Sequence, residues 1–115
     1  MVVVEGVGGF RVPLGAQWDS ATLAGALDLP VVLVVGMRLG CLNHALLSAE
    51  AIVSRGLPWA GWIASILEPD MPALEENVRT LQTHLPAAYL GKLIRNTDPD
   101  AATAAIYSLQ WQSFP

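Results

Sequence analysis

The sequence predicts an α/β domain of three layers, built on a mainly parallel sheet. Residues 31–35 form a continuous apolar run between Pro30 and Gly36, which is typical of a strand buried on both faces in a parallel sheet. After a short loop comes a segment with helical spacing, so this part of the chain predicts a strand, a loop and a helix. Shorter apolar runs and helical segments then alternate, which favours right-handed crossovers between parallel strands.

The first strand is expected at Val2–Glu5, a short β-branched run that would need neighbouring strands on both sides. The turn Gly6-Val7-Gly8 follows it, and glycines let a ligand approach the backbone closely. A carboxylate at the carboxyl end of a parallel strand can bind Mg²⁺ or the groups around a nucleotide phosphate. The alternative for Glu5 is a solvated side chain in a tight turn. The pattern is not the dinucleotide fingerprint G-x-G-x-x-G, because position 11 is arginine.

The next elements are a helix and the central strand-loop-helix unit. The helix is expected over Ser20–Leu27, with Ser20 as its N-cap. A glycine-containing turn over residues 37–42 leads to a second helix, with Asn43 as N-cap or in the first turn and Gly56 as its stop. The free N–H groups at the start of such a helix face the carboxyl edge of a parallel sheet, where anions bind. We therefore expect part of any functional site at this helix start.

Two more strands are expected, at Ala60–Ala64 and Ala87–Leu90, on either side of an amphipathic helix over Ala73–Leu85. Glu75 and Arg79 lie four residues apart on this helix and can form an ion pair on its solvated face. Together with the strands expected at Val2–Glu5 and residues 31–35, these two strands make a predicted sheet of four strands.

A domain is expected over residues 1–96, followed by a C-terminal tail over residues 97–115. The tail can hold one more helix, because Asp98 is a good N-cap and Pro99 a good first residue.

Composition limits the class of protein. The 115 residues are 53% apolar and only 14% charged, with a mean hydropathy of +0.45. The apolar run Leu29–Val35 is much shorter than the ~18 residues of a membrane span, and Met1–Val4 has no basic flank, so neither a membrane helix nor a secretory signal is expected. The net charge is −4 and the basic residues are scattered, which argues against nucleic-acid binding. A single cysteine, Cys41, fits a reducing cytoplasm.

The low fraction of charged residues also implies one of two surfaces. Either the surface is unusually apolar, or part of it is covered by something outside this chain, and we favour the second. Without further strands and helices, one face or edge of the sheet is expected to be bare, which predicts oligomerisation or aggregation.

Most other chemical patterns carry no function. Cys41 and His44 are too few for a metal site, which needs three or four ligands, so packing at the helix start is the better interpretation. Trp59 and Trp62 are expected to pack in the core or an interface rather than to stack on a ligand. No G-x-x-x-x-G-K-[ST] motif occurs in these residues, and Lys92 is the only lysine, so we expect no ATP hydrolysis by this chain alone.

Four segments of the chain, in order, closely resemble the second half of ATP-dependent dethiobiotin synthetases, which are ligases of biotin biosynthesis. These segments are EGVGGFRVPL (residues 5–14), RLGCLNHALLSAEAI (38–52), GLPWAGWIAS (56–65) and HLPAAYLG (84–91). The resemblance covers roughly residues 1 to 95.

The resemblance implies a P-loop-type, nucleotide-binding α/β domain that works as a cytoplasmic homodimer. It also implies a reaction in which ATP and Mg²⁺ activate a carbamate formed from CO₂ and 7,8-diaminononanoate, and the second amine then closes a cyclic urea. In this family the P-loop and the catalytic lysines belong to the first half, which these residues do not match. No catalytic residue is therefore assigned here.

The resemblance also implies roles for individual residues. Glu5 matches an acidic Mg²⁺ ligand, and Gly6, Val7 and Gly8 match the turn that contacts the nucleotide. The helix start that holds the substrate carboxylate of the partner subunit is matched by Gly40, Cys41, Leu42 and Asn43. Two positions depart from the family. Ser65 replaces an asparagine that reads adenine, and Leu93-Ile94-Arg95 replaces a proline-containing turn near the base.

Two hypotheses about function follow. In the first, the chain is the second half of a dethiobiotin synthetase, truncated and active only when the first half is supplied. In the second, it is a non-catalytic remnant or interaction module that pairs with a full-length or first-half subunit, as a homodimer or a mixed dimer.

Overall fold

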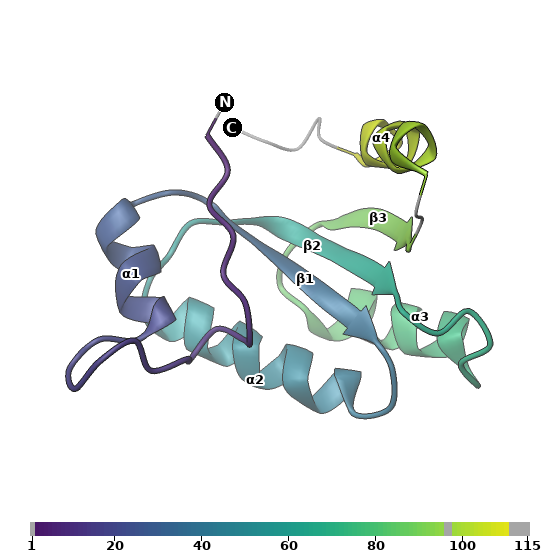
Figure 1. The fold of residues 1–115 in the computed structure, drawn as a ribbon. Coiled ribbons are helices and arrows are strands. Elements are labelled where there is room, and N and C mark those ends of the chain that lie inside the picture. Colours follow the sequence, from purple (N-terminus) through teal and green to yellow (C-terminus); the bar gives the residue numbers. More distant parts are fainter. Residues whose placement is uncertain (1, 96–97, 111–115) are drawn as a thin grey trace.

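The computed structural model describes residues 2–95 and 98–110, which fold into three parallel strands and four helices (Figure 1). In chain order these are α1 (Ser20–Leu27), β1 (Val31–Met37), α2 (Cys41–Ser54), β2 (Trp59–Ile66), α3 (Leu74–His84), β3 (Tyr89–Ile94) and α4 (Pro99–Tyr107). The sheet order is β1-β2-β3, and both strand pairs are parallel. The predicted α/β class with a parallel sheet is confirmed.

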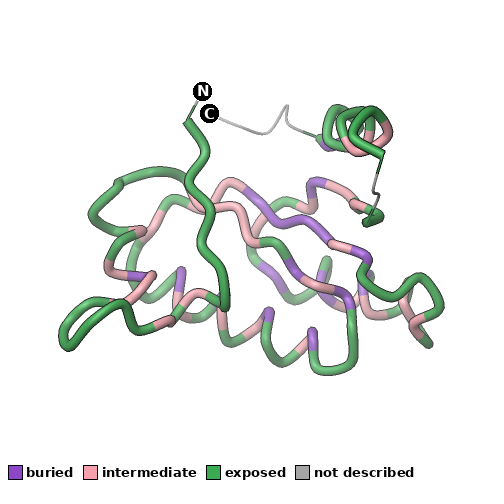
Figure 2. Tube along the Cα trace, in the orientation of Figure 1, coloured by how far each residue is buried: buried purple, intermediate pink, exposed green. Residues whose placement is uncertain are grey.

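The prediction of a strand at Val2–Glu5 was wrong. These residues are in no helix or strand, and they lie exposed to solvent in the segment before α1 (Figure 2). A run this short forms few ladder hydrogen bonds, and a strand apolar on both faces is stable only when neighbours cover it. The described chain offers no such neighbours, so its sheet has three strands rather than four.

Helices lie on both sides of the sheet, which makes the arrangement three-layered (Figure 1). α2 and α3 pack on one face, where the main core contains buried residues of β1, β2 and both helices; its members with the largest buried side chains are Met37, Trp62 and Leu81. On the other face a smaller cluster joins Ile63 and Leu90 to Leu109, which follows α4. The predicted tail helix is confirmed, with Asp98 as its N-cap and Pro99 in its first turn. The boundary expected between residues 96 and 97 falls outside the described residues.

The two edges of the sheet differ. The edge of β3 is partly covered by the residues after α4, because the Gln110 backbone N–H donates to the Leu90 carbonyl at 2.8 Å. No strand pairs with the outer edge of β1 within the described chain, and Val34 in the middle of β1 is 58% exposed. The bare edge that the apolar run predicted is therefore at β1.

Several predicted details needed correction. Asp19, rather than Ser20, caps α1, because its carboxylate accepts from the Thr22 backbone N–H at 2.7 Å. Glu75 does not pair with Arg79. It accepts from the Lys92 ammonium of β3 at 2.6 Å, while Arg79 lies 3.5 Å from the Glu76 carboxylate.

Candidate functional site

The candidate site lies at the carboxyl edge of the sheet. Because β1, β2 and β3 are parallel and in register, their last residues lie side by side: Met37 is opposite Ile66, which is opposite Ile94. α2 begins only a few residues after β1, so its N-terminus opens at this same edge (Figure 1). Ligands of α/β proteins bind outside the carboxyl ends of the strands.

The N-terminus of α2 presents free backbone donors. Gly40 is its N-cap, with φ 91° and ψ −5°, a left-handed conformation in which glycine carries no steric penalty. A Cβ atom at Gly40 would meet nothing within 4 Å, so the backbone here is open to a ligand. Among the described residues the N–H groups of Leu42 and Asn43 have no hydrogen-bond acceptor, whereas Cys41 donates to the Arg38 carbonyl and His44 to the Gly40 carbonyl. These two N–H groups, together with the helix dipole, favour an anion.

The side chains of the first turn of α2 differ in their surroundings. Cys41 is buried in the main core, so it anchors the helix start to the sheet. Asn43 and His44 are exposed, and the Asn43 amide makes no hydrogen bond with another described residue. Asn43 therefore lies in the first turn and leaves its side chain free to donate to a ligand, while Gly40 caps the helix without a side chain.

Ser65 lies at the same edge as the α2 N-terminus. It is a half-buried residue of β2, and its register partners are Gly36 on β1 and Leu93 on β3. The predicted residues Gly40–Asn43 and Ser65 are therefore brought together by the parallel topology. Ile94 ends β3 beside them, and Arg95 follows.

Glu5 and the turn Gly6–Gly8 that follows it are not part of the sheet. Glu5, Gly6, Val7 and Gly8 are all exposed and belong to no strand. The hydrogen bonds that fix the following residues come from the α1 side, because the Ser20 hydroxyl donates to the Phe10 carbonyl at 2.6 Å. No hydrogen bond or ion pair between described residues joins Glu5–Gly8 to the α2 N-terminus.

Two arginines at the carboxyl edge were not recognised from the sequence. The described ion pairs use Arg11, Arg55, Arg79 and Lys92. The remaining basic residues, Arg38 and Arg95, are exposed and have no ion-pair partner among the described residues. The signal was available, because Arg38 directly follows β1 and Arg95 directly follows β3.

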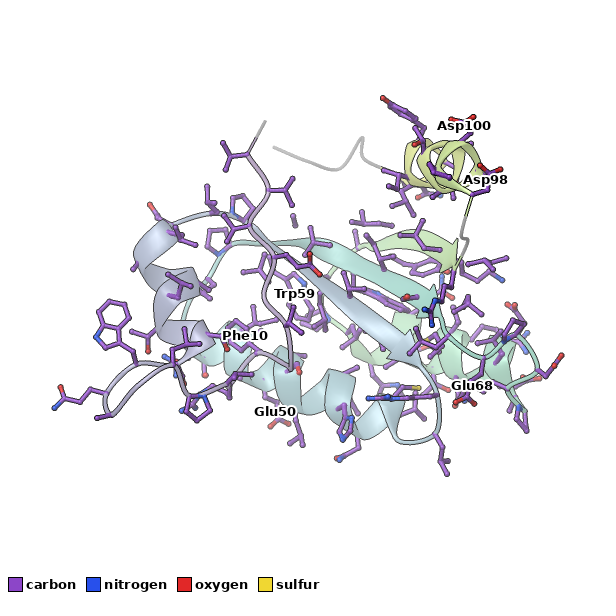
Figure 3. The ribbon with its side chains drawn as sticks, viewed as in Figure 1. Phe10, Glu50, Trp59, Glu68, Asp98 and Asp100 are labelled. Atoms are coloured by element: carbon purple, nitrogen blue, oxygen red, sulfur yellow. The ribbon has the colours of Figure 1, made fainter. Side chains whose placement is uncertain are left out.

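Acidic side chains also occur near this edge. Glu68 lies in the loop after β2 (Figure 3), and Asp70 follows it two residues later. The edge therefore carries both signs of charge, and the open backbone of α2 is its most specific feature for an anion.

The strongest electrostatic cluster lies away from this edge, at the start of α1. Asp19 forms ion pairs with Arg11 and, at 3.7 Å, with Arg55. Hydrogen bonds from Thr22, with a smaller contribution from Arg11, lower the pKa of the Asp19 carboxyl from 3.8 to about 2. A hollow of about 330 Å³ is lined by these residues and by Trp18, but it contains no residue of the predicted site. The cluster caps and anchors α1.

Metal-ligating groups and membrane-spanning helices were also sought among the described residues. Among the described residues, no group of three or more His, Cys, Asp or Glu side chains is placed to hold a metal ion, so Glu5 belongs to no such group. No helix in the described part of the chain has the length and apolarity to cross a bilayer.

Comparisons with known proteins agree with this architecture. The model of a family described as an AAA domain matches residues 1–103. A protein named ATP-dependent dethiobiotin synthetase BioD from Ralstonia nicotianae is 60% identical over 104 residues, which are 90% of this chain and 45% of the relative. Proteins of the same name from a Janthinobacterium species and from Aromatoleum aromaticum are 56% and 52% identical, over 92% of this chain and 45% and 48% of the relatives.

The chain thus spans about half the length of the curated relatives that it matches. The family model covers most of the chain, including all three strands and the α2 N-terminus. The chain belongs to this AAA-domain family, and within it resembles the dethiobiotin synthetases.

Proposed function

We propose that this chain supplies one part of a dethiobiotin synthetase site, in which the N-terminus of α2 binds the carboxylate of 7,8-diaminononanoate. The observation that carries the proposal is the open helix start at Gly40, within a segment that is 60% identical to a named dethiobiotin synthetase. Two free N–H groups, the exposed Asn43 amide and the unpaired Arg38 all suit a carboxylate ligand.

The proposal assigns ATP chemistry to residues outside these 115. ATP-dependent ligation requires a cradle for the phosphates and cations that neutralise developing charge. The sequence has no phosphate-binding loop and one lysine, and Lys92 is already paired with Glu75. The chain alone is therefore expected to be inactive in ATP-dependent ligation. It takes part in this reaction when a phosphate-binding loop is supplied, either in the same polypeptide or in another one.

Glu5 is the residue of this chain that would hold Mg²⁺, with Gly6, Val7 and Gly8 beside the nucleotide. Its carboxylate is exposed and has no partner among the described residues, so it is free to bind a cation. Mg²⁺ commonly binds proteins through only one or two carboxylates, with substrate phosphates and water completing its shell. When bound, the ion would neutralise phosphate charge. Ser65 would lie near the adenine.

A homodimer or mixed dimer forms part of this proposal. In the resembling family the carboxylate site of one subunit serves the other, so binding at Gly40–Asn43 would matter only in an assembled protein. The exposed apolar side chains of α2, which include Leu47 and Val53, are compatible with such a contact.

The test uses the chain alone and a chimera. In the chimera, the matched segment of the Ralstonia relative is replaced by the corresponding residues of this chain. We expect no ATP turnover above background from the chain alone, and dethiobiotin formation by the chimera with ATP, Mg²⁺, CO₂ and 7,8-diaminononanoate.

Glu5→Gln should weaken the Mg²⁺ dependence of the chimera, whereas Glu50→Gln, on the side of α2 away from the sheet (Figure 3), should not. A folded chimera that binds ATP but forms no dethiobiotin would support the alternative, a non-catalytic interaction module.

A further inference from the structure

Asp19 joins three separate parts of the chain through one carboxylate. One oxygen, Oδ1, accepts from the Thr22 backbone N–H at 2.7 Å and from the Thr22 hydroxyl at 2.8 Å, which caps α1. The other oxygen, Oδ2, accepts from the Nε of Arg11 and lies 3.7 Å from a terminal nitrogen of Arg55. Arg11 belongs to the segment that follows the Gly6–Gly8 turn, and Arg55 is the C-cap residue of α2. The carboxylate therefore ties this segment and the end of α2 to the start of α1.

Ser20 holds the same segment through its side chain and its backbone. The Ser20 hydroxyl donates to the Phe10 carbonyl at 2.6 Å and accepts from the Val12 backbone N–H at 2.9 Å. The Ser20 backbone N–H donates to the Val12 carbonyl at 2.9 Å. A Cβ atom at Gly8 would lie 3.4 Å from a Val12 methyl carbon, so the turn that follows Glu5 rests against the anchored segment. These contacts fix the stretch of chain that leads directly out of the turn.

The segment before α1 depends on such an anchor, because the sheet does not hold it. No hydrogen bond or ion pair between described residues joins residues 2–28 to β1, β2 or β3. The ion pair between Asp19 and Arg55 runs instead to α2, the helix whose N-terminus is the candidate carboxylate site. The Asp19 and Arg55 side chains are only 13% and 32% exposed, so solvent screens this pair less than a pair at the surface. The pair therefore relates the position of Glu5–Gly8 to that of α2.

We propose that Asp19 is a positioning residue for the Mg²⁺ side of the site. Through Arg11 and Arg55 it fixes where Glu5–Gly8 lies relative to α2, and so relative to the substrate carboxylate. This inference rests on the proposed function, which assigns Mg²⁺ and the nucleotide to Glu5–Gly8. Asp19 acts through these residues and not on the substrate, since a metal ligand binds well only where the groups behind it hold its position.

Asp19→Asn separates this role from the helix cap. Asparagine is as good an N-cap as aspartate, so its amide oxygen can keep the hydrogen bonds from Thr22. Its NH₂ group replaces the oxygen that faces two guanidinium groups, so the contacts with Arg11 and Arg55 are lost. Asp28→Asn is the matched control. Asp28 lies at the other end of α1, forms no ion pair with a described residue, and has a left-handed conformation that asparagine tolerates.

The kinetic constants of the chimera test the positioning role. Asp19→Asn should raise the Mg²⁺ concentration that gives half-maximal activity by roughly threefold or more, with the KM for 7,8-diaminononanoate unchanged. A purely structural loss would lower the amount of active protein without a shift in either constant. Arg55→Gln should act in the same direction, and Arg55→Lys, which keeps the charge, should shift the Mg²⁺ dependence less. Asp28→Asn should leave both constants at the parent values.

Amide hydrogen exchange of the chain alone gives a readout that needs neither metal nor activity. Asp19→Asn should speed the exchange of the Val12 and Leu14 amides by about threefold or more, because both donate within the anchored segment, and the β1 amides should exchange as in the parent. Asp28→Asn should change none of these rates. An equal acceleration along the whole chain would indicate a global loss of stability and would overturn the inference.

These readouts separate the inference from the proposed function. An active chimera whose Mg²⁺ dependence responds equally to Asp19→Asn and Asp28→Asn would refute the positioning role and leave the function intact. A folded chimera that binds ATP without forming dethiobiotin would refute the function. In that case faster exchange at Val12 and Leu14 in Asp19→Asn, and not in Asp28→Asn, would still support the anchoring of the segment by Asp19.

Discussion

Gly61 on β2 is the position where one added methyl group should do most harm. A Cβ atom there would lie 2.7 Å from the Leu90 Cγ atom and 2.8 Å from the Ala88 carbonyl oxygen. The leucine can change its rotamer, but the Ala88 oxygen accepts the Trp62 backbone N–H at 2.9 Å and cannot move without loss of that hydrogen bond. Gly61→Ala should therefore strain the pairing of β2 with β3.

The loss of stability can be estimated from the effect of added methyl groups in other protein cores. Inserting a methyl group into a well-packed core destabilises by about 1–3 kcal/mol. For a domain of about 100 residues, each kcal/mol lowers Tm by roughly 4–8 °C, so a loss of roughly 4–24 °C is expected. Gly15→Ala is the matched control, because Gly15 has no neighbour within 4 Å of an added Cβ and no positive φ. It should change the stability by less than about 1 kcal/mol, in the stabilising direction.

Urea unfolding followed by tryptophan fluorescence measures both variants, with Trp62 as a fully buried reporter. Equal unfolding midpoints for Gly61→Ala and Gly15→Ala would refute the close approach of β2 and β3 at this point.

Three further predictions concern the elements around the sheet. Asp19→Ala should lower the urea midpoint at neutral pH. The folded-state pKa of Asp19 is depressed from 3.8 to about 2, so the stability that the ionised carboxylate contributes is present above pH 3.8 and is lost as the pH falls toward 2. The urea midpoints of variant and parent should therefore converge near pH 2. The control Asp70→Ala should show no such pH-dependent difference in midpoint. Leu109→Ala should destabilise by about 2–5 kcal/mol, because Leu109 is buried against Ile63 and Leu90, whereas Leu39→Ala, at an almost fully exposed position, should have little effect in thermal melts. A double-mutant cycle on Glu75 and Lys92 should give a coupling below about 1 kcal/mol, since both side chains are largely exposed; a larger value would mean that the pair holds α3 to β3.

The central strand-loop-helix unit was predictable because its information is local. The apolar run of β1 and the helical spacing of α2 each specify their element, and the short connection between them requires that the helix start near the carboxyl edge. The same pattern predicted free N–H groups at the start of this helix, but it placed that start near Asn43. The helix begins at Cys41 with Gly40 as its N-cap, a position that only the family resemblance indicated. The start of α4 at Asp98 and Pro99 was equally local, because the capping chemistry lies in adjacent residues.

Features that depend on distant residues were not predictable. Val2–Val4 has the composition of a strand, but a strand requires partners, and the described chain supplies none. Glu75 was assigned the partner available on its own helix, whereas the fold offers Lys92 on β3 at 2.6 Å. The unpaired state of Arg38 and Arg95 became visible only when the other cations were placed in their ion pairs.

The most direct test of the central claim is the KM of the chimera for 7,8-diaminononanoate, compared with its KM for ATP. An anion at a helix N-terminus gains about 0.3–1 kcal/mol from the dipole, and the Asn43 amide can add a hydrogen bond.

Asn43→Leu and Gly40→Pro should therefore raise the KM for the diamine by roughly two- to fivefold or more, with the KM for ATP unchanged, and Glu50→Gln should alter neither constant. If both variants keep the parent KM for 7,8-diaminononanoate in a folded, active chimera, the α2 N-terminus does not bind the substrate carboxylate.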